Sequence, residues 1–180
     1  MVLNPGSERN LISICLKDSN KIIDVETAEI FPEHFSVPGH KFIFMAMMYL
    51  FSKKINPKPM AIIEVLNNDQ SKKSVDELGG LEYLTILEEA NIPSDNLSIF
   101  IEKIKQSYTR RMLLSISDSV HDFVLSDKAE VLNPSELISF VEQKITDLSV
   151  NSATSDEVYK MGTKTEEILN QRAENPSQVP

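Results

Sequence analysis

The sequence predicts an all-α protein, built as a small globular helical bundle, a long antiparallel helical hairpin and a separate C-terminal linker helix. Apolar residues recur in steps of three and four along most of the 180 residues, which places them on one face of a helix. β-branched residues follow the same spacing instead of the alternation that a strand shows. The chain also contains no Trp and only five Gly. These observations together favour helices throughout.

The globular bundle is expected over residues 7–93, after a flexible arm at residues 1–6. The arm contains a proline–glycine pair, which breaks regular structure, and few residues that could pack. A first short helix is predicted from Ser7, and a second over residues 22–28.

The centre of the bundle is expected to be the segment 41–54, KFIFMAMMYLFSKK, which is apolar on all sides. A helix without a polar face is typical of the middle of a bundle. Residues 60–66 predict a short amphipathic helix, whereas the polar stretch 67–73 is expected to be an exposed loop. A last short helix is expected after a break at Gly79 and Gly80.

The longest helical signal covers residues 94–126, without an internal Gly or Pro. At a rise of about 1.5 Å per residue this helix would be roughly 45–50 Å long. A compact domain of this size cannot cover such a length, so part of the apolar stripe needs a partner helix, from this chain or another. The stripe consists of Leu97, Ile101, Ile104, Tyr108, Met112, Ile116, Val120 and Phe123.

A new helix is predicted after Asn133, which can act as its cap, with Pro134 in the first position and Glu136 in the first turn. Because the connection from the long helix is short, this helix is expected to fold back antiparallel, giving a hairpin over residues 94–149. Its apolar residues repeat at steps of three and four: Leu137, Ile138, Val141, Ile145 and Leu148.

The C-terminal part is expected to hold a flexible linker at residues 150–155, a linker helix at residues 156–174 and a tail at residues 175–180. Gly162 weakens the linker helix, which would gain stability by docking on another surface. Its thin apolar stripe supplies the expected docking face, Val158, Ile168 and Leu169.

The composition limits the function. A net charge of −9 argues against tight binding of nucleic acid by this chain alone, because such binding needs a basic surface. A single cysteine, Cys15, excludes an internal disulfide and its apolar surroundings predict a buried core residue. No apolar run approaches the roughly 20 residues that span a bilayer, and no signal pattern opens the chain. We therefore expect a cytoplasmic protein without a membrane partner.

The sequence contains no convincing catalytic motif. Residues 162–165, GTKT, are the nearest approach to a phosphate-binding loop, but the lysine is one place late and the upstream glycine is missing. His34 and His40 flank a proline turn without a cysteine or an HExxH helix, which favours packing or capping at a helix start. The alternative is a small helical metal or acid–base enzyme that uses these two histidines and nearby carboxylates.

The middle of the long helix is locally basic in an acidic chain, because Arg110 and Arg111 lie near Lys103 and Lys105. The ordinary interpretation is a solvated face with ion pairs along the helix. The alternative is a contact with an acidic partner. The apolar stripe has the same two interpretations, intramolecular core or self-association surface.

Four segments resemble, in order and spacing, motifs of DnaB-type replicative DNA helicases. Residues 35–47, FSVPGHKFIFMAM, resemble the family's DF…H..IF.AM segment, and residues 77–84, ELGGLEYL, resemble its GG..YL turn. Residues 91–97, NIPSDNL, are similar to its PS..N start of the hairpin, and Arg110-Arg111 fall where the family has a basic pair. The likeness covers essentially the whole chain.

The chain also departs from the family pattern. Ser36 stands where an aromatic residue is common, and the segment 57–59 replaces an acidic helix start. The N-terminal arm is short. These differences point to a divergent, phage-type member.

The resemblance implies an N-terminal domain plus linker helix whose hairpins pair, with three pairs forming a collar on a hexameric helicase ring. It implies primase and a helicase loader as partners, docked on the collar and linker. It places ATP, Mg²⁺ and DNA binding in a RecA-like motor domain outside this sequence. We therefore expect oligomerisation and partner docking from this chain, with no catalysis and no cofactor or metal of its own, while the full-length helicase unwinds duplex DNA using ATP.

The apolar spacing and the resemblance together predict the interface residues of the hairpin. Arg110 and Arg111 are the expected partner contact. The alternative function is a stand-alone helical adaptor, helicase loader or inhibitor that shares the collar fold, which a reading frame ending at Pro180 would favour. The predicted oligomer interface consists of Ile104, Tyr108, Met112, Ile116, Phe123, Leu137, Val141 and Ile145.

Overall fold

A computed structural model describes residues 3–66 and 69–153, and within them every regular element is a helix. The predicted all-α fold class is confirmed. The chain divides into two compact units, Met1–Leu114 and Ser115–Pro180. The predicted linker helix at residues 156–174, its docking residues Val158, Ile168 and Leu169, and the tail at residues 175–180 lie outside the described residues.

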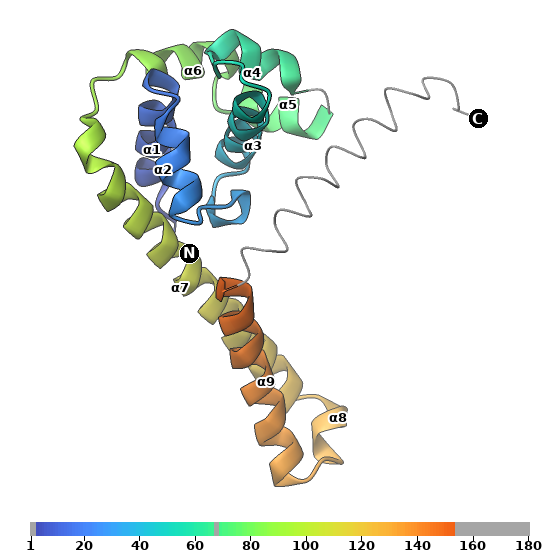
Figure 1. The fold of residues 1–180 in the computed structure, drawn as a ribbon. Coiled ribbons are helices and arrows are strands. Elements are labelled where there is room, and N and C mark those ends of the chain that lie inside the picture. Colours follow the sequence, from blue (N-terminus) through green and yellow to red (C-terminus); the bar gives the residue numbers. More distant parts are fainter. Residues whose placement is uncertain (1–2, 67–68, 154–180) are drawn as a thin grey trace. The chain divides into compact units, whose positions relative to one another are not determined.

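The first unit is a bundle of short helices that leads into one long helix (Figure 1). Two single-turn 3-10 helices, η1 (Pro32–His34) and η2 (Ser94–Asn96), connect its parts. The α-helices are α1 (Pro5–Lys17), α2 (Lys21–Thr27), α3 (Pro38–Ser52), α4 (Pro59–Val65), α5 (Asp69–Asp76), α6 (Gly80–Glu89) and the first part of α7 (Leu97–Val124).

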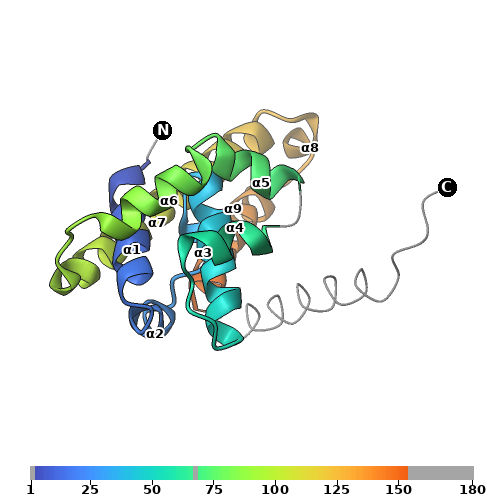
Figure 2. The same cartoon turned by 90° about the horizontal axis from the view of Figure 1, so that it is seen from above.

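Helix α3 is the central helix of this unit, as its apolar sequence predicts. It contacts α1, α4, α5 and η1, and Figure 2 shows it between α1 and α4. Ile43, Phe44 and Met47 of α3 are fully buried in the core that α1 and α6 complete. Cys15 is also fully buried, and this burial raises the pKa of its thiol to about 12. The thiol therefore acts as the small core residue that the sequence predicts.

The N-terminus of α1 differs from the expectation. The helix begins at Pro5, so the arm predicted over residues 1–6 is wrong from that residue on. The side chain of Asn4 accepts a hydrogen bond from the backbone N–H of Ser7 at 3.2 Å. A capping side chain followed by proline in the first helical position is a favoured helix start, and it outweighs the helix-breaking tendency of Gly6.

The exposed loop predicted over residues 67–73 is also wrong from Asp69 onward, because α5 begins there. Ser71 and Val75 are buried, while the lysines between them are exposed. The helix packs closely on α3, whose Gly39 lies next to Ser74 and Leu78. Tertiary packing of a few small or apolar side chains thus stabilises a helix whose sequence alone looks like a loop.

The second unit is a helical hairpin formed by the end of α7, the single turn α8 (Asp127–Glu130) and α9 (Pro134–Ala153) (Figure 1). The predicted helix start is confirmed by a reciprocal pair of hydrogen bonds. The N–H of Asn133 donates to the Glu136 carboxylate at 2.9 Å, and the N–H of Glu136 donates to the Asn133 side chain at 3.1 Å. Helix α9 continues to Ala153, so the linker predicted at residues 150–155 is wrong for its first four residues.

Candidate functional site

The hairpin has few fully buried apolar residues. Between Ser115 and Asp147, the only apolar residue that is buried is Ala129. The larger apolar side chains of the stripe are half-buried or exposed, and none of them is fully buried. A unit of two helices buries a smaller share of its apolar surface than a larger domain does. The half-buried members are Ile116, Val120, Phe123, Leu132, Leu137, Phe140 and Val141.

A stack of two aromatic rings joins the two helices of the hairpin. The rings of Phe123 and Phe140 lie 3.7 Å apart between centroids, with an angle of 18° between their planes. Phe123 was predicted to lie in the apolar stripe, whereas Phe140 was not. Phe140 lies three residues after Leu137 on the same helix face, and this spacing could have placed it in the apolar stripe. A shallow groove of about 410 Å³ opens beside the rings.

Several other large apolar side chains of the hairpin are exposed to water. Val131 is 84% exposed, Leu125 is 72% exposed and Ile138 is 59% exposed. Single exposed apolar residues are normal on protein surfaces. Three of them on a two-helix unit make the hairpin a candidate for an interaction surface.

The structure separates the predicted interface residues into two groups. Ile104 is only 1% exposed and belongs to the core of the first unit, so its assignment to an oligomer interface is corrected. Tyr108 contacts the edge of the His34 ring, with centroids 4.4 Å apart. The others lie at least partly at the surface, and their interface role stays a prediction: Met112, Ile116, Phe123, Leu137, Val141 and Ile145.

The two arginines predicted as a partner contact differ in their surroundings. Arg110 is exposed. Arg111 donates a hydrogen bond to the backbone carbonyl of His34 at 2.8 Å, and its guanidinium lies 5.7 Å from the centre of the Tyr108 ring. Its second terminal nitrogen, Nη1, is buried. Arg111 is thus engaged within the first unit, and the partner-contact role of both arginines stays a prediction.

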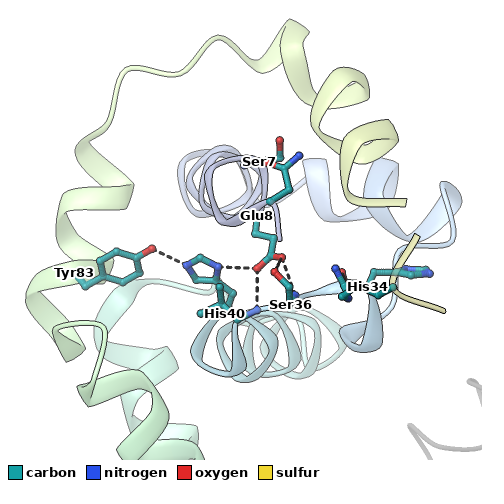
Figure 3. A network of polar contacts seen from close by, with 9 residues as sticks. Ser7, Glu8, His34, Ser36, His40 and Tyr83 are labelled. Atoms are coloured by element: carbon teal, nitrogen blue, oxygen red, sulfur yellow. Dashed lines mark hydrogen bonds and ion pairs between the residues drawn. The ribbon is translucent and has the colours of Figure 1, made fainter. Parts of the chain in front are cut away.

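A buried polar cluster joins α1, α3 and α6 inside the first unit (Figure 3). Glu8 is 1% exposed and His40 is 2% exposed. One carboxylate oxygen of Glu8 accepts from the Ser36 N–H at 2.7 Å and from the Ser36 hydroxyl, and the other accepts from the Val37 N–H at 3.2 Å. His40 Nδ1 lies 2.9 Å from the same carboxylate, and its Nε2 lies 2.7 Å from the Tyr83 hydroxyl.

This cluster places a carboxylate at the N-terminus of α3, where backbone N–H groups favour negative charge. Burial alone raises the pKa of Glu8, but hydrogen bonds from His40 and Ser36 outweigh it, so the pKa lies below its ordinary value. Glu8 stays ionised and orients His40, whose Nδ1–H donates to it. Glu8 and His40 were not linked by the sequence reasoning, because 32 residues separate them and no local pattern connects them.

The two histidines have separate, structural partners. His34 Nδ1 accepts a hydrogen bond from the Phe31 N–H at 2.9 Å, and His40 belongs to the Glu8 cluster. The predicted packing and capping roles are confirmed. Over the ranges 3–66 and 69–153, no three His, Cys, Asp or Glu side chains are grouped so that they could hold a metal ion. The geometry therefore gives no support to the alternative of a metal enzyme.

His34 leads to a prediction about pH. Burial, reinforced by the positive charge of Lys105, lowers the pKa of His34 from 6.5 to about 4. As the pH falls below 6.5, the unfolded chain binds this proton before the folded chain does. The free energy of unfolding should therefore decrease between pH 6.5 and pH 4, by about 1 kcal/mol for this partly exposed side chain.

The measurement is urea unfolding of the wild type and His34→Gln over this pH range. We expect the pH dependence to be weaker in His34→Gln by that amount. His121→Gln, at an exposed ring, controls for the change of residue type. Parallel pH profiles in the wild type and His34→Gln would contradict the prediction.

None of the helices in the described ranges is long and apolar enough to cross a membrane. Residues 2–106 match the family described as "DnaB-like helicase N terminal domain". No curated protein matches the sequence. Among solved structures, the chain is similar to the crystal structure of the N-terminal domain of DnaB helicase from Mycobacterium tuberculosis. The TM-score is 0.68 at 18% identity, over 81% of this chain and 97% of that chain, which is a likeness of fold.

Proposed function

Because the chain belongs to the DnaB-like helicase N-terminal domain family, we propose that it serves a replicative DNA helicase by self-association and partner docking. In this proposal the hairpins of two copies pair, and the paired domains form a collar to which primase and a helicase loader bind. DNA unwinding, ATP, Mg²⁺ and contact with DNA belong to a motor domain of the full-length protein. The alternative of a stand-alone adaptor or inhibitor has no observation in its favour.

The exposed apolar side chains of the hairpin, between Ser115 and Asp147, carry this proposal. Apolar burial contributes about 25 cal/mol per Å², and the hairpin leaves five large apolar side chains more than half exposed: Val124, Leu125, Val131, Ile138 and Ile145. A second hairpin laid against the first would complete a four-helix arrangement and cover both stripes. Membership of the family supports a second copy of this chain as the partner, because the family implies oligomerisation for its members.

The substitution Ile138→Asp tests the proposal. Ile138 is more than half exposed, so an aspartate is tolerated in the isolated chain but would be buried at a paired surface. We expect self-association to weaken by about 3 kcal/mol, roughly 100-fold in Kd. Light scattering over a concentration series measures the effect.

The matched control is Ile86→Asp. Ile86 lies on α6 of the first unit and is 58% exposed, against 59% for Ile138, so the two variants differ only in the unit they alter. Ile86→Asp should associate like the wild type. Unchanged association of a folded Ile138→Asp chain would contradict pairing through this face of the hairpin.

A further inference from the structure

A groove of about 580 Å³ lies between α2 and the beginning of α7. Along α2 its lining residues are Lys21, Asp24 and Ala28, in steps of three and four that place them on one helix face. Along α7 the same spacing relates Ile101 and Lys105. All lining residues belong to the unit that ends at residue 114, so the groove is formed by the first unit alone.

The floor of the groove is apolar. Leu97 is 5% exposed, and Ala28 and Ile101 are partly buried. The groove follows the chain from Asp95 to Lys105, which corresponds to roughly 15 Å of helix, or about three turns. An apolar floor of this length between two helices fits one face of a third helix.

The two ends of the groove carry opposite charge. Asp24 pairs with the Lys21 amine at 2.8 Å and raises the pKa of this lysine, and the negative charges of Asp18 and Asp95 add to the effect. At this end a single amine therefore lies among three carboxylates. Lys105 lies at the other end, and its positive charge is only partly exposed to water.

We propose that this groove binds an amphipathic helix of a partner protein, with carboxylates in its first turn and Lys or Arg in its last turn; this deepens the partner docking of the proposed function and rests on it. The last turn of the partner helix lies against Asp95, its first turn lies against Lys105, and its apolar side chains cover Leu97. Complementary charge at both ends fixes the direction of the bound helix. The same distribution of charge suits the dipole of the partner helix itself. Glu102, on the exposed edge of the groove, favours a further Lys or Arg near the middle of that helix.

The test compares two synthetic peptides that are long enough for about three helical turns and share one Leu and Ala face. The first peptide has Glu in its first turn and Arg in its last, and the second has these charges exchanged. Fluorescence anisotropy at low salt should give a Kd for the first peptide that is roughly tenfold lower than for the second. The double variant Asp95→Lys/Lys105→Glu should invert this preference, because it exchanges the charges of the groove. Each peptide keeps its own helix propensity in both measurements, so an inverted preference reports on the groove.

Lys103→Glu is the matched control, because Lys103 is an exposed residue of α7 outside the lining of the groove. It should keep the preference of the wild type. The proposal is overturned if neither peptide binds, if both bind the wild type equally, or if the double variant keeps the wild-type preference. Light scattering separates this failure from failure of the proposed function. If the wild type self-associates without a peptide preference, only the inference fails, whereas a wild type that stays monomeric at every concentration contradicts the proposed self-association.

Discussion

Gly39→Ala should destabilise the first unit by about 3 kcal/mol, at the upper end of the usual cost of overpacking. A Cβ at this position would lie 2.4 Å from Leu78 Cδ1 and 2.6 Å from the Ser74 carbonyl oxygen. The leucine side chain could turn away. The carbonyl belongs to the backbone of α5, so relief of this clash requires α5 to move away from α3.

The control is the same substitution in another helix. Gly6 lies in the first turn of α1, and a Cβ there would meet no atom within 4 Å. Gly6→Ala should therefore be neutral or stabilising by about 0.5 kcal/mol, since alanine has the smaller entropic cost in a helix. Urea unfolding of both variants, followed by circular dichroism, checks the pair. Equal stability of Gly39→Ala and Gly6→Ala would contradict the close packing of α3 on α5.

Glu8→Gln should be similarly destabilising, by about 3 kcal/mol, because it removes the negative charge that accepts hydrogen bonds from the buried groups of Ser36, Val37 and His40. The NH2 group of glutamine is a hydrogen-bond donor. It would face other donors, either the Val37 N–H or the His40 Nδ1–H. A typical domain is stable by only about 5–15 kcal/mol, so the loss is a large fraction of the total. Glu64→Gln, at an exposed position on α4, is the control and should have little effect.

The effect of Glu8→Gln should also depend on pH. The pKa of Glu8 in the folded chain lies below its ordinary value of 4.5. The carboxylate therefore stabilises the fold fully above pH 4.5, and this stabilisation is lost as the pH falls from 4.5 through the folded pKa. The difference in unfolding free energy between wild type and Glu8→Gln should be constant near neutral pH and shrink below 4.5. A difference that stays constant down to pH 3 would show that the side chain acts by shape and not by charge.

Local signals in the sequence were sufficient for the all-α class and for the hairpin. The cap formed by Asn133, Pro134 and Glu136 depends on neighbours within three residues, and it is present as predicted. The apolar sequence of α3 likewise placed it at the centre of the bundle. The cap depends on contacts close in sequence, and the position of α3 follows from a helix that is apolar on all sides.

The errors have a different origin. Helix α5 is stabilised by packing on α3 around Gly39, which no pattern within residues 67–73 encodes. Ile104 repeats in step with the hairpin stripe, but the fold of the first unit covers it. The spacing of apolar residues along a helix shows which of them share one face. Whether that face is buried within the chain depends on the rest of the fold. The Glu8 cluster was missed for the same reason, since its members come from three helices.

The central claim is that the hairpin pairs with a second copy of this chain. The most direct test is the mass of the wild-type chain by sedimentation equilibrium over a wide concentration series. The account predicts at least twice the chain mass of 20.3 kDa at high concentration, falling toward 20.3 kDa on dilution. A mass of 20.3 kDa at every concentration would contradict it.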